Sequence, residues 1–383
     1  MAKSSGTKGY QYEEILRAYF LRAGLFVLRG VPFQFAGSDL TDIDLWLYER
    51  PNGATRRIQI CDIKYKQRPK AVERVFWTRG LAEALGVDGA YVATTDKRPG
   101  IHTIGEKVGI VVLDGTDLAR IAGSESVLFE DRVSDENLSQ FLKDADEEVK
   151  SKTLQAEKAE LLSVVAQDFG ASSLVQALGS FQRVTNYILS ARPDSDQVIG
   201  AGRLMYLSAA IVCESLDFVS AEAAFKSVDD RRRRMLEAVR FGRLGTANGE
   251  HALQMAIGLI ERYGQGGAAQ AQVIKASLDK DLAKIPAEII ADQAIRLSKG
   301  SGLFNIGREF EMACYLQTLP TFDELSKPAK GMLGSLLDFA GIDRERLANS
   351  WAAKGSGPTA HELATEDAAK AEGQLGLFGE GTP

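Results

Sequence analysis

The sequence predicts an α/β domain with a mixed central sheet flanked by helices, followed by an all-α domain and a disordered tail. In residues 1–124, short apolar segments with the two-residue period of strands alternate with helical segments. From residue 125 the strand-like alternation stops, and amphipathic helical segments follow one another. From residue 353 the chain is rich in Gly, Ala, Ser, Glu and Thr, a composition typical of disorder. We therefore expect three parts: residues 1–124, 125–352 and 353–383.

The first part begins with a helix over 10–23, where apolar side chains recur at helical spacing. A strand is expected over 25–31, followed by a loop over 36–40. Two strands joined by a turn are expected within 41–66, because Pro51, Asn52 and Gly53 are typical of hairpin turns. The remaining elements are a helix over 71–85, a strand over 89–95, a helix over 101–107, a strand over 109–113 and a final segment over 116–121.

The sequence of the second part, residues 125–352, predicts helices throughout. Residues 134–167 are charged and helical in pattern. Further helices are expected at 174–189, 201–216, 221–241, 251–263, 287–297, 309–318 and 325–339, with glycine clusters between some of them. Four consecutive arginines at 231–234 cannot all face one partner on a helix. They form either a solvated face or a second DNA-contact patch.

The hairpin within 41–66 carries charged residues on one predicted face. Successive strand residues point to opposite sides, so Asp44 lies on the same side of its strand as Trp46 and Tyr48. On the next strand, Asp62 and Lys64 share a side with Ile58 and Ile60. Charges in such an apolar strand cost free energy unless they are paired or bind a metal ion.

These residue types suit metal-assisted phosphodiester hydrolysis. Mg²⁺ or Mn²⁺ takes one or two carboxylates and keeps other positions for water and phosphate, so Asp44 and Asp62 are candidate ligands. Lys64 would then orient the attacking water. Asp39 and Asp42 lie nearby in the sequence and could supplement Asp44. The alternative is an ordinary hairpin with a surface ion pair.

Asp44 followed by Asp62-Ile-Lys64 resembles the motif of PD-(D/E)xK nucleases, although Ile43 stands where that motif has proline. The run Gly-Tyr-Gln-Tyr-Glu13 is similar to the G-x-x-F-E of Mrr-type members, and Asp114-Gly-x-x-Leu matches a later segment of them. The resemblance covers about the first 120 residues. It implies a restriction-endonuclease-like fold, and it implies that Glu13 holds a second metal ion or orients water. Otherwise Glu13 is an acid favoured by the helix dipole.

Basic residues follow Lys64. Lys66, Arg68, Lys70 and Arg74 are expected to contact DNA phosphates. The alternative is a solvated loop and helix face. Residues 1–124 hold 18 Lys and Arg against 14 Asp and Glu, whereas the rest of the chain holds 28 against 38. The basic excess therefore accompanies the candidate site, as phosphate binding requires.

The composition excludes several other chemistries. The three cysteines and three histidines are scattered, so no zinc finger and no histidine-based nuclease site is expected. No G-x-x-x-x-G-K-[ST] loop is present, which speaks against an ATPase. The polar N-terminus and the lack of a long apolar run predict no signal peptide, no membrane partner and a cytoplasmic location.

The tail contains the pentapeptide formed by Gln374, Leu375, Gly376, Leu377 and Phe378, which resembles the Q-L-x-L-F peptide that binds the bacterial sliding clamp. Large apolar residues in a tail without a core are typical of a peptide that enters a partner's pocket. The alternative is that the tail folds back onto this chain.

The sequence thus predicts a Mg²⁺-dependent deoxyribonuclease, with an endonuclease favoured, acting in DNA repair, restriction or defence against foreign DNA. Recruitment by the sliding clamp would raise its local concentration on DNA. A homodimer is expected by analogy with restriction-like nucleases. Two alternatives stay open: a non-catalytic DNA-binding or adaptor protein on a nuclease-like scaffold, and one subunit of a multi-protein defence complex.

Overall fold

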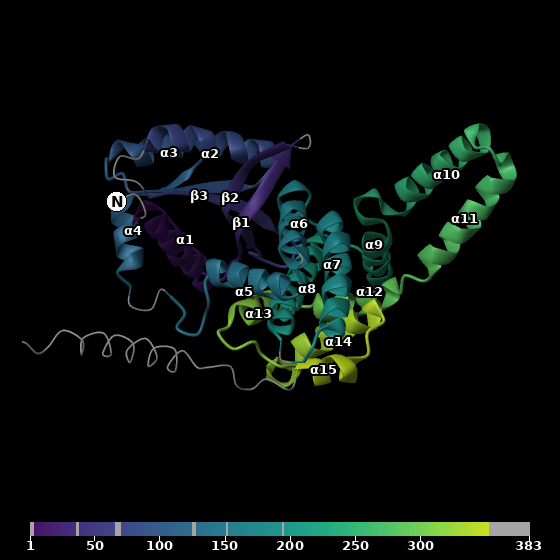
Figure 1. Ribbon diagram of the computed structural model, residues 1–383. Coiled ribbons are helices and arrows are strands. Elements are labelled where there is room, and N and C mark those ends of the chain that lie inside the picture. The colour runs from purple at the N-terminus through teal and green to yellow at the C-terminus, as the bar shows by residue number, and fades with distance from the viewer. Residues whose placement is uncertain are drawn as a thin grey trace, which may run out of the picture.

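The computed structural model describes residues 4–35, 38–65, 70–124, 128–150, 152–193 and 195–351. It has a five-stranded mixed sheet in the N-terminal region and a mostly helical C-terminal region (Figure 1). The α/β class and the change of character near residue 125 are therefore confirmed. The predicted tail over 353–383 lies outside the described residues, and so does its pentapeptide.

The strands lie in the sheet in their chain order. They are β1 (Phe26–Phe35), β2 (Ser38–Glu49), β3 (Arg57–Lys64), β4 (Gly89–Thr94) and β5 (Val111–Leu113). The first three pair antiparallel, and β3, β4 and β5 pair parallel. The predicted first strand is too short, because β1 continues past Pro32, which pairs with Asp42. The sheet tolerates this proline since β1 is an edge strand, where a missing N–H donor costs little.

Four helices belong to this region: α1 (Ser4–Arg22), α2 (Ala71–Leu85), α3 (Gly100–Val108) and α4 (Gly115–Ala122). Helices α1 and α4 cover one face of the sheet, where Leu16, Leu45 and Cys61 share a core. Helices α2 and α3 cover part of the other face. The end of α2 is confirmed at Gly86, which adopts the left-handed conformation with φ 66° and caps the helix.

The C-terminal region is built from helices α5 to α15. Their bounds are α5 (Asp135–Glu148), α6 (Thr153–Gln167), α7 (Ala171–Ser190), α8 (Asp196–Glu222), α9 (Val228–Phe241), α10 (Gly245–Tyr263), α11 (Gly267–Ala283), α12 (Ala287–Leu297), α13 (Gly302–Tyr315), α14 (Lys327–Ala340) and α15 (Arg344–Trp351), with one-turn helices η1 (Gly242–Leu244) and η2 (Phe322–Glu324).

The predicted start of the helix over 221–241 is wrong. Helix α8 runs on to Glu222, and α9 begins only after Ser227, whose hydroxyl accepts from the backbone N–H of Asp230 at 3.1 Å. Helix α11 was not expected, because its apolar residues are mainly alanines and its periodicity is weak.

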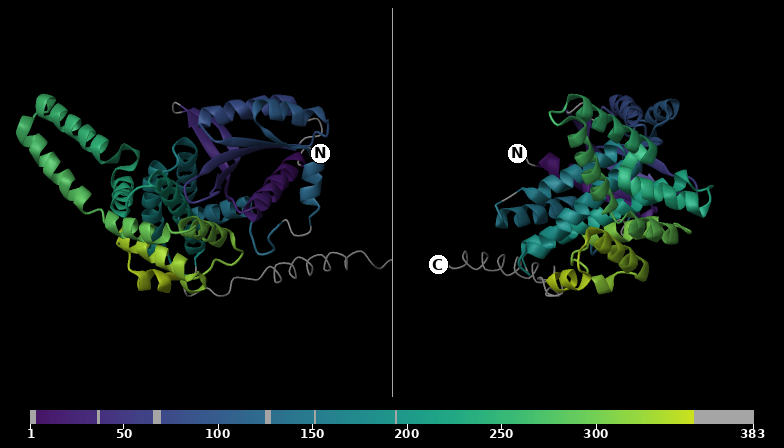
Figure 2. Two further views of the ribbon diagram at one scale, coloured as in Figure 1. Left: turned by 180° about the vertical axis from the view of Figure 1, so that it is seen from behind. Right: turned by 90° about the vertical axis from the view of Figure 1, so that its right-hand side faces the viewer.

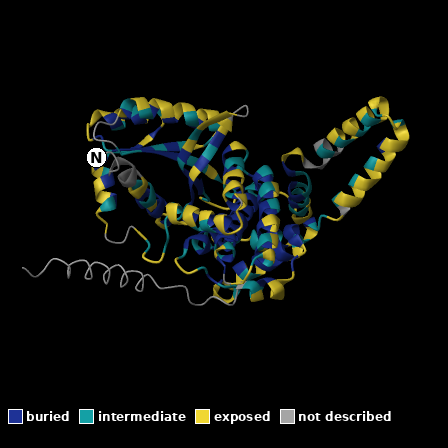
Figure 3. Ribbon diagram, viewed as in Figure 1, coloured by how far each residue is buried: buried dark blue, intermediate teal, exposed yellow. Residues whose placement is uncertain are grey.

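Helix α8 is long and apolar enough to cross a membrane by length and composition. Most of it is buried, and α5, α7 and α13 pack around it. This is the pattern of a core helix (Figure 3). The expectation that the sequence has no long apolar run is therefore wrong for α8.

The sheet and the helical region share one hydrophobic core. Trp46 and Tyr48 of β2 are fully buried, and their rings lie 4.7 and 5.2 Å from that of Phe169, centroid to centroid. The Tyr48 hydroxyl donates to Asp217 of α8 at 2.9 Å. The helical region therefore covers the part of this sheet face that α2 and α3 leave open.

A buried ion-pair cluster joins the other side of the sheet to the helical region. Arg17 of α1 donates to Glu311 of α13 at 2.9 Å, and both side chains are completely buried. Arg132 also binds Glu311, and the Arg17 guanidinium lies 3.8 Å from the centre of the Tyr315 ring. Helix α1 is thereby fixed to α13 as well as to the sheet.

Candidate functional site

Asp44 and Asp62 lie on neighbouring strands at the point where the β2–β3 ladder ends. The last paired residues are Leu45 and Cys61, so Asp44 and Asp62 occupy the next opposed positions. Their strand neighbours Trp46 and Ile60 belong to the core on the α2 side of the sheet. Because side chains alternate along a strand, the two carboxylates emerge on that same side. The alternation expected from the sequence places them there.

The ladder ends because the Asp44 side chain replaces a backbone partner. One carboxylate oxygen of Asp44 accepts from the backbone N–H of Ile63 at 2.6 Å. Within the described residues Asp44 forms no ion pair. Burial raises the pKa of Asp44, and the N–H of Ile63 and the charges of Arg74 and Lys64 only partly offset it. A nearby cation would therefore stabilise this carboxylate in its ionised form.

Asp62 is buried and is bound by a helix residue. Arg74, in the first turns of α2, donates from Nε to Oδ2 of Asp62 at 2.8 Å and from Nη2 to the other oxygen. A bidentate pair of this kind is among the stronger charge-assisted contacts. Both oxygens of one candidate metal ligand thus already have a cationic partner.

Lys64 is the last residue of β3 and is half-exposed. It forms no ion pair with any other described residue. Its charge lowers the pKa of Asp44, as does that of Arg74. Asp44, Asp62, Lys64 and Arg74 therefore form one cluster. In it, the Lys64 amine has no ion-pair partner among the described residues.

Glu13 lies on α1, which covers the face of the sheet opposite to the two carboxylates, and it is held by another residue. It accepts from Nε of Arg29 at 2.8 Å, and Arg29 also binds Glu14 of α1 and Glu136 of α5. Burial raises the pKa of Glu13, Arg29 lowers it, and the negative charge of Asp44 raises it further. The charge of Asp44 therefore acts on Glu13, while the Glu13 carboxylate is bound to Arg29.

The residues expected to contact DNA are only partly described. Lys66 and Arg68 lie outside the described residues. Lys70 is exposed and pairs with Glu73 at 3.0 Å. Arg74 lies beside the carboxylates, where it binds Asp62 rather than facing open solvent. The run at 231–234 is also largely paired: Arg232 binds Asp292, Arg233 binds Asp230, and Arg234 binds Glu222.

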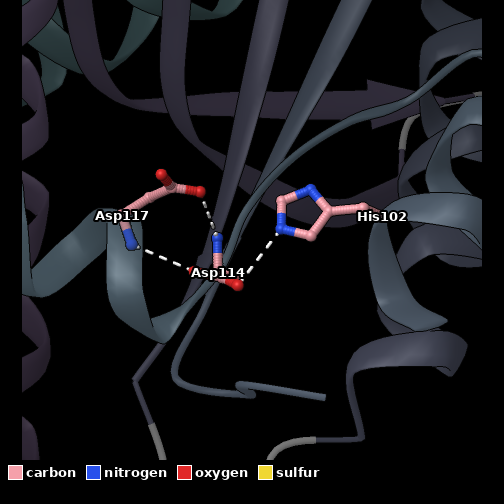
Figure 4. Close-up of side chains that lie close together, drawn as sticks. All are labelled: His102, Asp114 and Asp117. Atoms are coloured by element: carbon pink, nitrogen blue, oxygen red, sulfur yellow. Dashed lines mark hydrogen bonds and ion pairs between the residues drawn. The ribbon is translucent and has the colours of Figure 1, made fainter. Parts of the chain in front are cut away.

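Sequence reasoning missed Arg29, which is buried in β1. A lone arginine within an apolar strand is the same signal that singled out Asp62, and it could have been found on that ground. His102, Asp114 and Asp117 were also missed as a group. Their ligand atoms lie within 4.8 Å of one another, and His102 Nε2 is 3.1 Å from Asp114 (Figure 4).

The group around Asp114 has a structural explanation. Asp114 caps α4, and its side chain accepts from the backbone N–H groups of Thr116 and Asp117. The Asp117 side chain in turn accepts from the Asp114 backbone N–H, which completes a capping box. The Asp-Gly of the sequence is therefore accounted for by the start of a helix.

A cleft of about 830 Å³ opens beside the site rather than at it. It lies between the outer halves of β1 and β2 and helix α6, and its lining includes Asp39, Asp42 and Glu160. No lysine or arginine is among its described lining residues, so it is unsuited to phosphate. Asp39 and Asp42 face this cleft and are separate from the Asp44–Asp62 cluster.

No family model, no curated protein and no solved structure matches this chain.

Proposed function

We propose that the chain is a metal-dependent DNA nuclease of the PD-(D/E)xK type, with an N-terminal restriction-endonuclease-like domain. One observation carries the proposal: Asp44 and Asp62 emerge on the same side of two neighbouring strands, and Lys64 follows two residues along β3. Charged residues at such positions, in strands that are otherwise apolar, call for a cation. Carboxylate oxygens are the ligands that Mg²⁺ and Mn²⁺ prefer.

The donor set fits such an ion. Asp44 offers an oxygen that no other described residue binds, and its burial penalises an ionised carboxylate without a cation. Asp62 and Glu13 would complete the carboxylate set on release from Arg74 and Arg29. A bound Mg²⁺ or Mn²⁺ would supply Lewis-acid polarisation of the phosphate and an activated water.

The chain's own residues would position the water, stabilise charge on the phosphate and bind the DNA. Lys64 has a half-exposed amine near Asp44, so it would orient the attacking water and stabilise charge on the phosphate. Arg74 would contact a DNA phosphate once it leaves Asp62, since its guanidinium is adapted to bind phosphate in a bidentate manner. Lys66, Arg68 and Lys70 would contact phosphates farther along the strand.

The experiment is cleavage of DNA by wild type, Lys64→Ala and Asp62→Asn, with Mg²⁺ or with EDTA. Circular single-stranded, circular duplex and linear DNA separate internal cutting from cutting at ends. We expect both variants to lose at least about 100-fold in rate, the usual effect of removing such a group. Lys284→Ala, an exposed residue of the helical region that pairs with Asp281 at 2.8 Å and has no part in the candidate site, is the control. Wild-type rates in both site variants would refute the assignment.

A second candidate is a non-catalytic DNA-binding or adaptor protein, and one observation favours it. Arg74 saturates both oxygens of Asp62, so the cluster is neutralised in part without any metal ion. The two proposals differ in a titration of the protein with Mn²⁺: a nuclease binds the ion through Asp44 and Asp62, whereas a scaffold does not.

The cellular role we propose is DNA repair, restriction or defence against foreign DNA in the cytoplasm. Residues 374–378 would bring the enzyme to the sliding clamp on DNA. The large helical region leaves room for a place in a multi-protein defence complex, with other activities supplied by its partners.

A further inference from the structure

Helices α10 and α11 form an arm that stands away from the rest of the protein (Figures 1 and 2). They pack antiparallel against one another, and α10 also contacts α9 and η1 at its base. At about 1.5 Å per residue, α10 is about 28 Å long. Most of the described side chains of this arm are exposed (Figure 3). The arm therefore has little core of its own.

One stripe of α10 is used within the arm. Leu253, Ile257 and Ile260 are half-buried and recur at helical spacing. On α11 the matching positions are Ala271, which is buried, and Ile274 and Leu278, which are half-buried. These are the residues through which the two helices meet.

A second apolar stripe of α10 has no cover among the described residues. Met255 and Leu259 are each 57% exposed, and Tyr263 is 75% exposed. At about 100° per residue, these three residues and Ala252 and Ala256 fall within an arc of about 100°. We call these five residues the outer stripe. Its centre lies about 110° around the helix from the stripe that meets α11.

A two-helix arm with an uncovered apolar stripe is an incomplete bundle. Helices of this length gain most of their stability from packing an apolar face, and four-helix bundles satisfy this with two pairs. Large apolar side chains at 57% and 75% exposure in one row mark an interaction site rather than scattered surface residues.

We propose that the outer stripe binds the outer stripe of a second copy of this chain, so that two arms form an antiparallel four-helix bundle. This dimer does not depend on the nuclease activity proposed above.

The order of residues within the stripe suits pairing with itself. If two α10 helices run antiparallel about a two-fold axis between residues 257 and 258, Ala256 faces Leu259 of the second copy. Ala252 then faces Tyr263 of the second copy. In these two pairs a small residue lies opposite a large one, which allows close packing, whereas Met255 lies opposite Ile260 of the second copy.

Charge also favours a second copy over nucleic acid. Residues 245–283 contain Arg262, Lys275 and Lys280 against four acidic residues. A net charge of this size neither repels a second arm nor attracts phosphates. The outer stripe runs about 17 Å along the roughly 28 Å of α10. Two such helices packed face to face along their length bury on the order of 1,000 Å², which is the lower limit for a specific interface.

The first test is the mass of the full chain in solution, measured by analytical ultracentrifugation from about 1 to 100 μM. We expect a dimer for wild type and a monomer for the double variant Met255→Glu/Leu259→Glu, with an unchanged helix content by circular dichroism since both side chains are exposed. A wild type that stays monomeric throughout, or a double variant that stays dimeric, would overturn the proposal.

The second test is site-specific crosslinking, which separates a second copy from any other occupant. All three native cysteines are buried, so an introduced cysteine reports on its own position. Ala256→Cys lies near the expected two-fold axis and should form a disulfide-linked dimer on mild oxidation. Gln254→Cys lies on the opposite side of α10 and should not. Equal crosslinking of the two variants, or none in either, would refute the symmetric pairing.

Discussion

Arg74 of α2 binds both carboxylate oxygens of Asp62 on β3, with Nε donating to Oδ2 at 2.8 Å. The contact joins a helix to the strand that ends in Lys64, so it orients the carboxylate at the centre of the candidate site. It also places a fixed positive charge where the proposed function requires a divalent ion. The arginine and the metal ion therefore compete for the same two oxygens.

This competition predicts tighter metal binding in the variant Arg74→Gln. Loss of a charge-assisted pair of about 1.5–3 kcal/mol should raise Mn²⁺ affinity by about 10- to 100-fold. Isothermal titration of the protein with Mn²⁺ would measure it. The matched control is Arg79→Gln on the same helix, where the arginine pairs with Glu83 at 2.7 Å away from the site. Equal affinity in wild type and Arg74→Gln would mean that Asp62 is not a ligand.

Much of the site was predictable from sequence because strands impose a two-residue period. That period put Asp62 and Lys64 on one side of their strand and Asp44 on the side of Trp46, and the register of β2 and β3 brings these two sides together. The partners of these residues were not predictable in the same way. Arg74 and Arg29 reach the site from α2 and β1, and contacts between separate elements leave no period in the sequence.

The buried cluster around Glu311 predicts a large loss of stability in Glu311→Gln. Two arginines would then lack their buried counter-ion, which typically costs about 3–5 kcal/mol in the free energy of unfolding. Urea denaturation would measure this difference. Glu83→Gln, which removes an exposed pair, should change the free energy of unfolding by less than about 1 kcal/mol.

The ionisation of Glu311 also predicts how the free energy of unfolding changes at acid pH. Burial alone would raise the pKa of Glu311, but the charges of Arg132 and Arg17 outweigh it and hold the pKa below its ordinary value. Stability from this group is therefore present above about pH 4.3, the unfolded value, and is lost as the pH falls through the folded pKa. Wild type should thus lose more stability than Glu311→Gln on acidification below that pH. A constant difference would contradict the ionised cluster.

We expect the contribution of Glu214 on α8 to the free energy of unfolding to depend on pH in the opposite direction. Glu214 is completely buried, and neither of its oxygens has a hydrogen-bonding partner among the described residues. Burial and the charge of Asp217 raise its pKa well above the ordinary value, although Arg308 partly offsets them. The contribution of Glu214 is thus greatest below about pH 4.3 and is lost as the pH rises through the folded pKa.

Glu214→Gln should therefore gain in melting temperature relative to wild type between pH 5 and pH 8, because glutamine does not titrate. Thermal melts of both proteins across this range would show it. A difference that stays constant, or that shrinks toward pH 8, would mean that Glu214 is ionised throughout.

The tail predicts binding to a bacterial sliding clamp. Deletion of residues 374–383 should abolish co-migration of the full chain with the clamp in size-exclusion chromatography. Leu377→Ala should have the same effect, since this side chain is expected to fill an apolar pocket. Gly376→Ala, at the unspecified position of the peptide, should leave binding intact. Co-migration of the deletion variant would exclude the peptide as the binding segment.

The helical region was the least predictable part. Its helices followed from apolar periodicity, yet nothing in the sequence indicated that Tyr48 would reach Asp217 or that Arg17 would reach Glu311. Residues near 221–227 also carry alanines that suit a helix, and only the cap at Ser227 separates α8 from α9. Local propensity does not resolve such breaks, because tertiary packing decides them.

The core shared through Trp46 and Tyr48 limits how this protein can have evolved and how it can be divided. A fragment ending near residue 124 would expose both rings to water, together with the arginines that face Asp217, and should aggregate when expressed alone. Recombination that joined this sheet to a different helical partner would need matching changes on β2. The sheet and the helical region are therefore expected to unfold as one unit.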